Sequence, residues 1–215
     1  MKYLCVFFGL FLLSYVAQSQ EIAITERGDS VVLFGNGTWD YYDNYTNEKE
    51  KSIEIKFNEK KYKKPSGATT KITGKNGVYE IWYKPSDWKR LPPAKLNPEA
   101  DVALQFLGGD VYSMVIYEEL EIPVKQLSQI ALDNAASVAK DIQMIDREYR
   151  VVNSDTVVCM QMEGTTQGIG MVYYSYYYSN KNGSIQFHTF TGKSLLGKYK
   201  SAIEDLLNGF MIKEE

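Results

Sequence analysis

Residues 171–180 read MVYYSYYYSN and place five tyrosines in ten positions. Successive side chains of a β-strand point to opposite faces, so an extended chain divides these residues into two sets. One face carries Val172, Tyr174, Tyr176 and Tyr178, and the other carries Tyr173, Ser175, Tyr177 and Ser179. The first face is bulkier and more continuous, and we expect it to meet a helix. Tyrosine has a high strand propensity and packs well across strands, so the favoured interpretation is a packed strand.

A second interpretation of the same stretch is an aromatic surface that binds sugars, peptides or a partner protein. Tyrosine combines a flat apolar ring with a polar tip, and this combination suits contact surfaces. The candidate binding residues on this interpretation are Tyr173, Tyr174, Tyr176, Tyr177 and Tyr178.

The segments around this stretch also resemble strands. Residues 143–153, 155–164 and 184–192 are rich in β-branched, aromatic and alternating residues, and short turn signals separate them. Residues 100–123 predict a hairpin around Gly108-Gly109, and residues 77–91 predict a strand that Pro85 stops. A sheet of consecutive, hairpin-connected strands is therefore expected, and such a sheet is antiparallel.

Two helices complete the pattern. Pro123 suits the start of a helix, and the apolar residues that follow it recur at three- and four-residue spacing: Val124, Leu127, Ala131, Ala135 and Val138. The segment 194–210 predicts a second helix, which begins at Ser194 and ends just before Gly209, a glycine that fits a position of positive φ. Strands with segregated helices indicate an α+β fold, in which the helices pack on an antiparallel sheet.

Two short motifs resemble the PsbP-like superfamily. The first is Tyr83-Lys84-Pro85-Ser86-Asp87-Trp88, and the second is Leu206-Leu207-Asn208-Gly209-Phe210 at the end of the last helix. The resemblance covers roughly residues 78–210. It implies an α/β/α sandwich around an antiparallel sheet, with members that act mostly as binding or accessory subunits, and it supplies no catalytic residue.

The remainder of the chain divides into three parts. Residues 1–19 have the lysine, apolar run and small residues of a cleavable signal peptide, so we expect export to the periplasm or the outside and no transmembrane anchor. Residues 20–47 predict a small β-hairpin element that contains a Gly-Thr-Trp sequence. Residues 48–76 predict a charged linker with one candidate short strand, ahead of the main domain at 77–215. The run KKYKKP at 60–65 is either solvated or in contact with an anionic surface.

The composition argues against several chemistries. The net charge of −3 gives no basic excess for nucleic acid. The sequence holds one histidine, His188, and outside the signal peptide one cysteine, Cys159, so we expect neither a metal site nor a cofactor. A Cys159–His188 pair is a remote catalytic alternative, because the flanks of both residues resemble core.

Three functional hypotheses follow. The leading hypothesis is an exported, non-enzymatic binding or accessory protein, expected to be a monomer that binds an envelope protein or a small ligand. The second is an envelope-associated structural protein that docks through its amino-terminal hairpins. The third is a hydrolase that uses paired carboxylates such as Asp110 with Glu118 or Glu119.

Overall fold

The computed structural model describes residues 21–213, except residues 26, 28, 34–37 and 42–54. Its main sheet has eight strands in the order β4-β10-β11-β12-β13-β9-β8-β7. The strands are β4 (Lys56–Tyr62), β7 (Trp88–Leu91), β8 (Ala100–Phe106), β9 (Val111–Glu118), β10 (Gln143–Val152), β11 (Asp155–Thr166), β12 (Ile169–Asn180) and β13 (Gly183–Gly192). Neighbouring strands are antiparallel, except that β4 runs parallel to β10. The tyrosine-rich stretch lies in β12, with hydrogen-bonded strands on both sides.

One face of this sheet is covered by α2 (Val124–Val138), which packs against β11, β12 and β13. The buried cluster beneath it contains Leu127 and Ala131 of the helix, together with Val158, Met160, Met162 and Tyr177 of the sheet. The helix forms where the apolar spacing predicts it, directly after Pro123. Its small Ala131 is buried against the strands, so the helix axis lies close to them.

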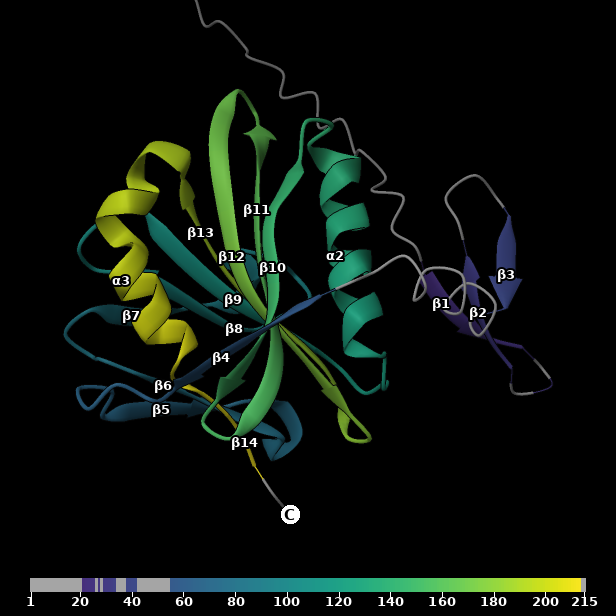
Figure 1. Ribbon diagram of the computed structural model, residues 1–215, viewed down its shortest axis with the longest axis horizontal. Helices are drawn as coiled ribbons and strands as arrows, with labels where there is room; N and C mark the ends of the chain where they lie inside the picture. The colour runs from purple at the N-terminus through teal and green to yellow at the C-terminus, as the bar shows by residue number, and fades with distance from the viewer. Residues whose placement is uncertain (1–20, 26, 28, 34–37, 42–54, 214–215) are drawn as a thin grey trace, which may run out of the picture.

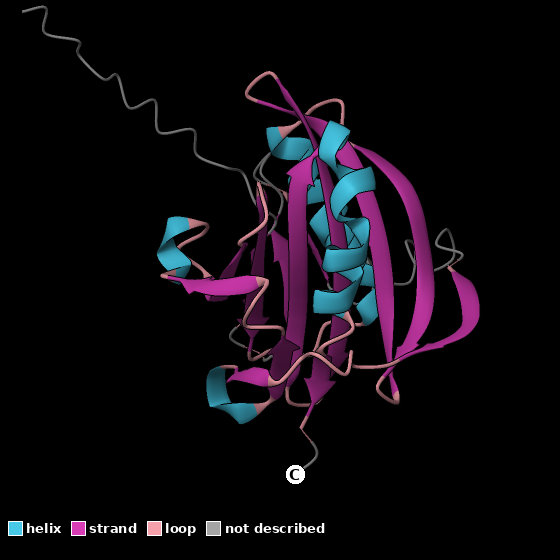
Figure 2. Ribbon diagram, turned by 90° about the vertical axis from the view of Figure 1, so that its left-hand side faces the viewer, coloured by secondary structure: helices cyan, strands magenta, loops and turns pink. Residues whose placement is uncertain are grey.

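The opposite face is covered by α3 (Leu196–Leu207), which packs against β12 and β13 and follows a short 3-10 turn, η3 (Lys193–Leu195). Its buried residues are Tyr199, Ile203, Leu206 and Leu207. They join a cluster that includes Cys159, Tyr174, Tyr176 and Phe187. The two helices lie on opposite sides of the large sheet in Figure 1, and Figure 2 shows α3 in front of the sheet, running roughly along its strands. The α+β class is therefore confirmed.

A second, three-stranded sheet shares the face of α3. It has the order β14-β6-β5 and consists of β5 (Thr70–Thr73), β6 (Tyr79–Tyr83) and β14 (Phe210–Ile212). Tyr79, Ile81 and Phe210 belong to the same buried cluster as α3. Pro85 separates β6 from β7, so the two halves of the predicted strand region at 77–91 enter different sheets.

Gly209 connects α3 to this small sheet. Its backbone carbonyl accepts a hydrogen bond from the Trp82 N–H at 2.8 Å, and a Cβ at Gly209 would overlap the Trp82 carbonyl oxygen. Gly209 is not among the described glycines with positive φ, which are Gly77, Gly168 and Gly183. The expected reason for this glycine was therefore wrong: the position needs glycine because two backbones approach closely.

The charged stretch contributes more strand than its composition suggests. Lys56–Tyr62 forms the edge strand β4, and Thr70–Thr73 forms β5, so both segments pair with strands of the folded body. Most side chains of β4 are exposed. Lysine-rich edges are common in natural sheets because they discourage pairing with another chain, and the charge that suggested a linker is typical of such an edge.

The amino-terminal element is a three-stranded antiparallel sheet of β1 (Glu21–Ile24), β2 (Ser30–Leu33) and β3 (Trp39–Tyr41). The expected signal peptide at 1–19 lies outside the described residues. Within the part of the chain that is described, no helix is long and apolar enough to cross a membrane.

Candidate functional site

The five candidate tyrosines of β12 separate onto the two faces, as strand alternation predicts. Tyr174 and Tyr176 are buried on the α3 face, and Tyr177 is buried on the α2 face. Tyr178 is half-buried against Phe210, with ring centroids 6.1 Å apart. Tyr173 is half-buried at the margin of the α2 cluster. The structure therefore does not assemble these residues into one aromatic platform.

On the α3 face, two tyrosine hydroxyls surround a buried arginine. Arg150 of β10 donates to the Tyr174 hydroxyl at 2.9 Å and to the Tyr176 hydroxyl at 3.5 Å. Its Nε forms an ion pair with Glu148 at 2.5 Å, and its guanidinium lies 4.6 Å from the ring centroid of Tyr62.

The Tyr176 hydroxyl also donates to Asn208 Oδ1 at 2.8 Å. Burial raises the pKa of both tyrosines above the ordinary value. This network joins β4, β10, β12 and α3, and its polar groups bond to one another.

On the α2 face, the polar residues are also used internally. The Ser175 hydroxyl lies 2.9 Å from Nδ1 of His188, and the ring of His188 meets the ring of Tyr177 edge-on at 5.7 Å. Burial lowers the pKa of His188 to about 4, so the ring is neutral at pH 7. The Tyr177 hydroxyl is buried and makes no hydrogen bond with any described residue.

From the tyrosine-rich stretch, Tyr173 reaches the surface beside α2. There it joins a row of aromatic residues that come from three neighbouring strands. The strand registers align Tyr112 of β9 with Phe190 of β13, and Phe190 with Tyr173 of β12. Ring centroids lie 5.8 Å apart for Tyr112 and Phe190, and 6.0 Å apart for Phe190 and Tyr173. All three side chains are half-buried. We call Tyr112, Phe190 and Tyr173 the aromatic row.

The course of α2 explains why this row is not covered. The start of the helix is held near the far ends of β12 and β13, where the Ile122 N–H bonds to the hydroxyls of Ser179 and Ser184. The loop after its other end reaches β11, where the Thr165 N–H bonds to Asp141. The helix thus crosses the sheet obliquely. The aromatic row lies at a corner of the sheet that α2 does not cover. Tyr112 and Phe190 were not among the predicted site residues, because only the strand register brings them to Tyr173.

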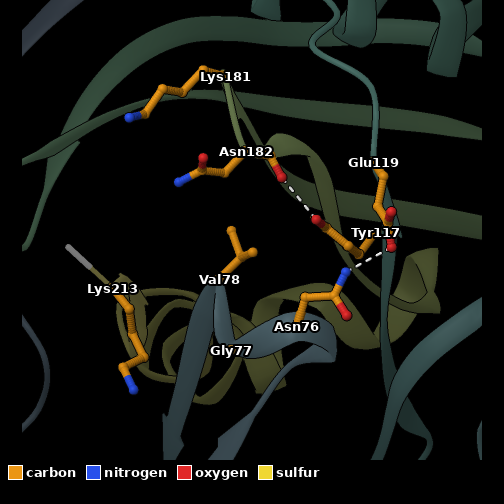
Figure 3. Close-up of a pocket in the computed structure, with 8 residues that line it drawn as sticks. All are labelled: Asn76, Gly77, Val78, Tyr117, Glu119, Lys181, Asn182 and Lys213. Atoms are coloured by element: carbon orange, nitrogen blue, oxygen red, sulfur yellow. Dashed lines mark hydrogen bonds between the residues drawn. The ribbon is translucent and has the colours of Figure 1, made fainter. Parts of the chain in front are cut away.

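A pocket of about 570 Å³ lies at the other end of β9, and Figure 3 shows the residues that line it. The Asn76 amide bonds to Glu119 at 2.6 Å, and the Tyr117 hydroxyl bonds to the backbone oxygen of Asn182 at 2.7 Å. Lys181 and Lys213 also line it, and their side chains do not point toward one another. The pocket has the volume of a small-molecule site. However, its lining carries both positive and negative side chains, and hydrogen bonds already join lining residues to one another.

The two catalytic alternatives are not assembled. Cys159 belongs to the cluster under α3, whereas His188 contacts Tyr177 under α2, so these residues lie on opposite faces of the sheet. Asp110 and Glu118 flank the two ends of β9, and a strand of this length separates them by about 26 Å. Paired carboxylates of glycoside hydrolases lie within roughly 10 Å. Among the described residues, no group of three or more metal-ligating side chains occurs.

The fold and these sites define an α+β protein in which the polar groups described on the two faces of β12 mostly bond to other groups of the protein. No protein-family model and no curated protein matches the sequence. The chain is similar to a cyanobacterial PsbP (CyanoP) from Synechocystis sp. PCC 6803, with 16% identity and a TM-score of 0.50 over 69% of this chain and 95% of that one.

Two further solved structures show weaker similarity. LpqN from Mycobacterium tuberculosis is 10% identical, with a TM-score of 0.45 over 67% of this chain and 90% of that one. PA94 from Pseudomonas aeruginosa is also 10% identical, with a TM-score of 0.44 over 63% of this chain and 92% of that one. The similarity to the cyanobacterial PsbP gives the chain a PsbP-like fold, as the two sequence motifs indicate.

Proposed function

We propose that this chain is an exported, non-enzymatic accessory protein that binds an envelope protein through its aromatic row. The observation that carries this proposal is the partly exposed alignment of Tyr112, Phe190 and Tyr173 across three strands. Half-buried Met114 and Ile116 follow Tyr112 on the same face of β9. Aromatic residues and methionine are enriched in the contact areas of protein interfaces, where charged residues are depleted.

The energetics favour this surface over the other tyrosines. Binding energy at interfaces is concentrated in a few aromatic or arginine anchors that become fully desolvated. The rings of the aromatic row are held by each other and by the sheet, so little side-chain freedom is lost when a partner covers them. By contrast, Tyr174, Tyr176 and Tyr177 are already buried and would have to leave the core to reach a partner.

The PsbP-like fold adds support by analogy. The sequence resemblance implies accessory or binding roles, although a shared fold does not by itself transfer a function. Asp110 and Glu118 stand about 26 Å apart along β9, so the hydrolase alternative loses the carboxylate pair on which it rested.

The binding proposal is tested with a Tyr112→Ser/Phe190→Ser variant. A photo-crosslinker at Met114 captures partners from an envelope extract of the source cells, and the variant should lose one specific crosslinked protein. The matched control is Phe57→Ser/Val138→Ser, which removes two side chains that are 59% and 65% exposed outside the row. Retention by the control and loss by the folded row variant support the proposal. Equal capture by all three proteins contradicts it.

Export is tested separately by intact-mass measurement of the protein from its native host. The expected mass lacks the residues up to Ser19 or Gln20, because Ala17-Gln18-Ser19 suits signal peptidase. A mature protein that retains residues 1–19 contradicts export by cleavage and leaves the binding test unaffected.

One observation favours the second hypothesis, docking through the amino-terminal element. Trp39 and Tyr41 of the edge strand β3 are 54% and 43% exposed, and their rings are in edge contact at 5.4 Å. Tryptophan and tyrosine are enriched among the residues that anchor protein interfaces. A Trp39→Ala/Tyr41→Ala variant in the same crosslinking assay separates the two surfaces. Loss of the partner in this variant alone assigns docking to the amino-terminal sheet.

A further inference from the structure

The basic run KKYKKP at 60–65 borders a cavity of about 520 Å³. Three lysines line this cavity: Lys61, Lys63 and Lys64. None of the described residues that line it is acidic, and Glu59, at the other end of the run, is not among them. The whole chain has a net charge of −3, so this concentration of positive charge is local.

The polypeptide around the cavity is held in place by the turn between β10 and β11. Asn153 and Ser154 both have positive φ, as the predicted turn requires. The Asn153 side chain accepts a hydrogen bond from the Lys64 N–H at 2.7 Å and donates to the carbonyls of Asn208 and Phe210 at 2.8 and 2.7 Å. Its own N–H bonds to the Tyr62 carbonyl at 3.0 Å. This one residue therefore joins β4, α3 and β14, and it forms a rigid border to the cavity.

The lysines are ordered to different degrees. The Lys64 ammonium donates to the Ala68 carbonyl at 3.1 Å and lies 4.6 Å from the ring centroid of Trp82. Lys61 and Lys63 are exposed at the rim. Lysines that protect a sheet edge are normally distributed along an open strand. Here three of them line one open cavity, and their mutual repulsion is relieved when an anion enters.

We propose that this cavity binds the phosphate group of a small phosphate ester. Lysine ammonium groups are common phosphate ligands, and Tyr62, Val151 and Met211 provide an apolar wall for the remainder of the molecule. The volume lies within the roughly 300–1,000 Å³ of small-molecule sites. The site lies at the β4 edge of the sheet, on the far side of the strand order from β9, so it is independent of the aromatic row.

The test uses phenyl phosphate and inorganic pyrophosphate as probes, with binding measured by calorimetry at low ionic strength. The variant is Lys61→Gln/Lys63→Gln, because Lys64 also supports the backbone. The control is Lys89→Gln/Lys140→Gln, which removes the same charge from exposed positions elsewhere. We expect saturable binding by the native chain, a roughly tenfold weaker affinity in the variant and an unchanged affinity in the control.

A second experiment distinguishes a lipid headgroup from a soluble ester. It measures co-sedimentation of the protein with vesicles of phosphatidylglycerol and phosphatidylcholine. Vesicle binding that pyrophosphate displaces identifies a lipid headgroup in the same cavity, and binding of the free probes alone identifies a soluble ester. The proposal is overturned if neither probe binds saturably, or if the control loses affinity as much as the variant. Vesicle binding that pyrophosphate does not displace also overturns it, because that result indicates general surface attraction.

Discussion

Arg150 reaches over β11 to donate a hydrogen bond to the hydroxyl of Tyr174 at 2.9 Å. The guanidinium and the Glu148 carboxylate beside it are only 8% and 16% exposed. The pair therefore resembles a buried ion pair whose remaining donors are satisfied by tyrosine hydroxyls. The tyrosines that looked like a binding surface thus have a structural task, which is to complete the hydrogen bonding of a buried cation.

We expect Arg150→Met to lower the free energy of unfolding by about 3–5 kcal/mol, because it leaves the largely buried Glu148 carboxylate without its cationic partner and with hydrogen bonds from Asn58 only. Arg150→Lys should recover only part of this loss, since lysine cannot contact Glu148, Tyr174 and Tyr176 together. Urea unfolding measures both variants. Arg90→Met, at an exposed position, is the control and should stay within about 0.5 kcal/mol of the native chain. A loss below about 1 kcal/mol in Arg150→Met would show that the network contributes little.

The paired tyrosines of β12 give a second prediction. Tyr176→Ala and Tyr177→Ala should each cost about 3–5 kcal/mol, because these side chains are 1% and 0% exposed. The phenylalanine variants should differ. Tyr176→Phe loses the hydrogen bond to Asn208 and should cost about 1 kcal/mol, whereas Tyr177→Phe removes a hydroxyl without a hydrogen-bond partner among the described residues and should be neutral or stabilising. Equal costs for the two phenylalanine variants would contradict this assignment.

The local parts of the fold could be predicted from the sequence. The β12 and β13 strands are rich in aromatic and β-branched residues and are separated by the short turn at Lys181 and Asn182, so their pairing depends on neighbouring residues only. The Pro123 start of α2 has the same local character. The order of strands and helices indicated the α+β class, and the resemblance carried by Tyr83–Trp88 and Leu206–Phe210 added the PsbP-like fold.

Features that depend on distant residues could not be predicted. The parallel pairing of β4 with β10 joins residues about 90 positions apart, and the lysine-rich edge strand shows no apolar face. The β14-β6-β5 sheet has the same difficulty, since Phe210 meets Ile81 only in the folded chain. The aromatic row likewise depends on the register of Tyr112, Phe190 and Tyr173. Local patterns assigned Tyr173 to a candidate surface but gave no means of finding its two neighbours.

Cys159 provides a third prediction. Burial raises the pKa of its thiol to about 12, so almost no thiolate is present at pH 8. In a Cys5→Ser chain, we expect an aromatic disulfide reagent to label Cys159 only when the protein unfolds, with a rate that rises steeply with urea. Labelling of the native protein as fast as that of the fully unfolded chain would show an accessible, reactive thiol.

His188 gives the last prediction, which concerns acid stability. Its ring is buried on the α2 face between Ser175 and Tyr177, and burial lowers its pKa from 6.5 to about 4. Above pH 6.5 the ring is neutral in both the folded and the unfolded chain, so the full stability is present. Between pH 6.5 and pH 4 the unfolded chain takes up a proton that the folded chain does not bind, so the stability falls as the pH falls. The total loss from this group is about 3 kcal/mol, at roughly 1.4 kcal/mol per pKa unit.

Urea unfolding at several pH values should show this slope, and His188→Gln should remove it between pH 6.5 and pH 5, where most carboxylates remain ionised. Because His188 is the only histidine of the sequence, the imidazole proton signals of an untagged chain report it directly by NMR. We expect these signals to stay at their neutral-ring positions down to about pH 5. A midpoint between pH 6 and pH 7 in the folded protein would mean that the ring meets solvent, and the packing of Ser175, Tyr177 and His188 under α2 would then be wrong.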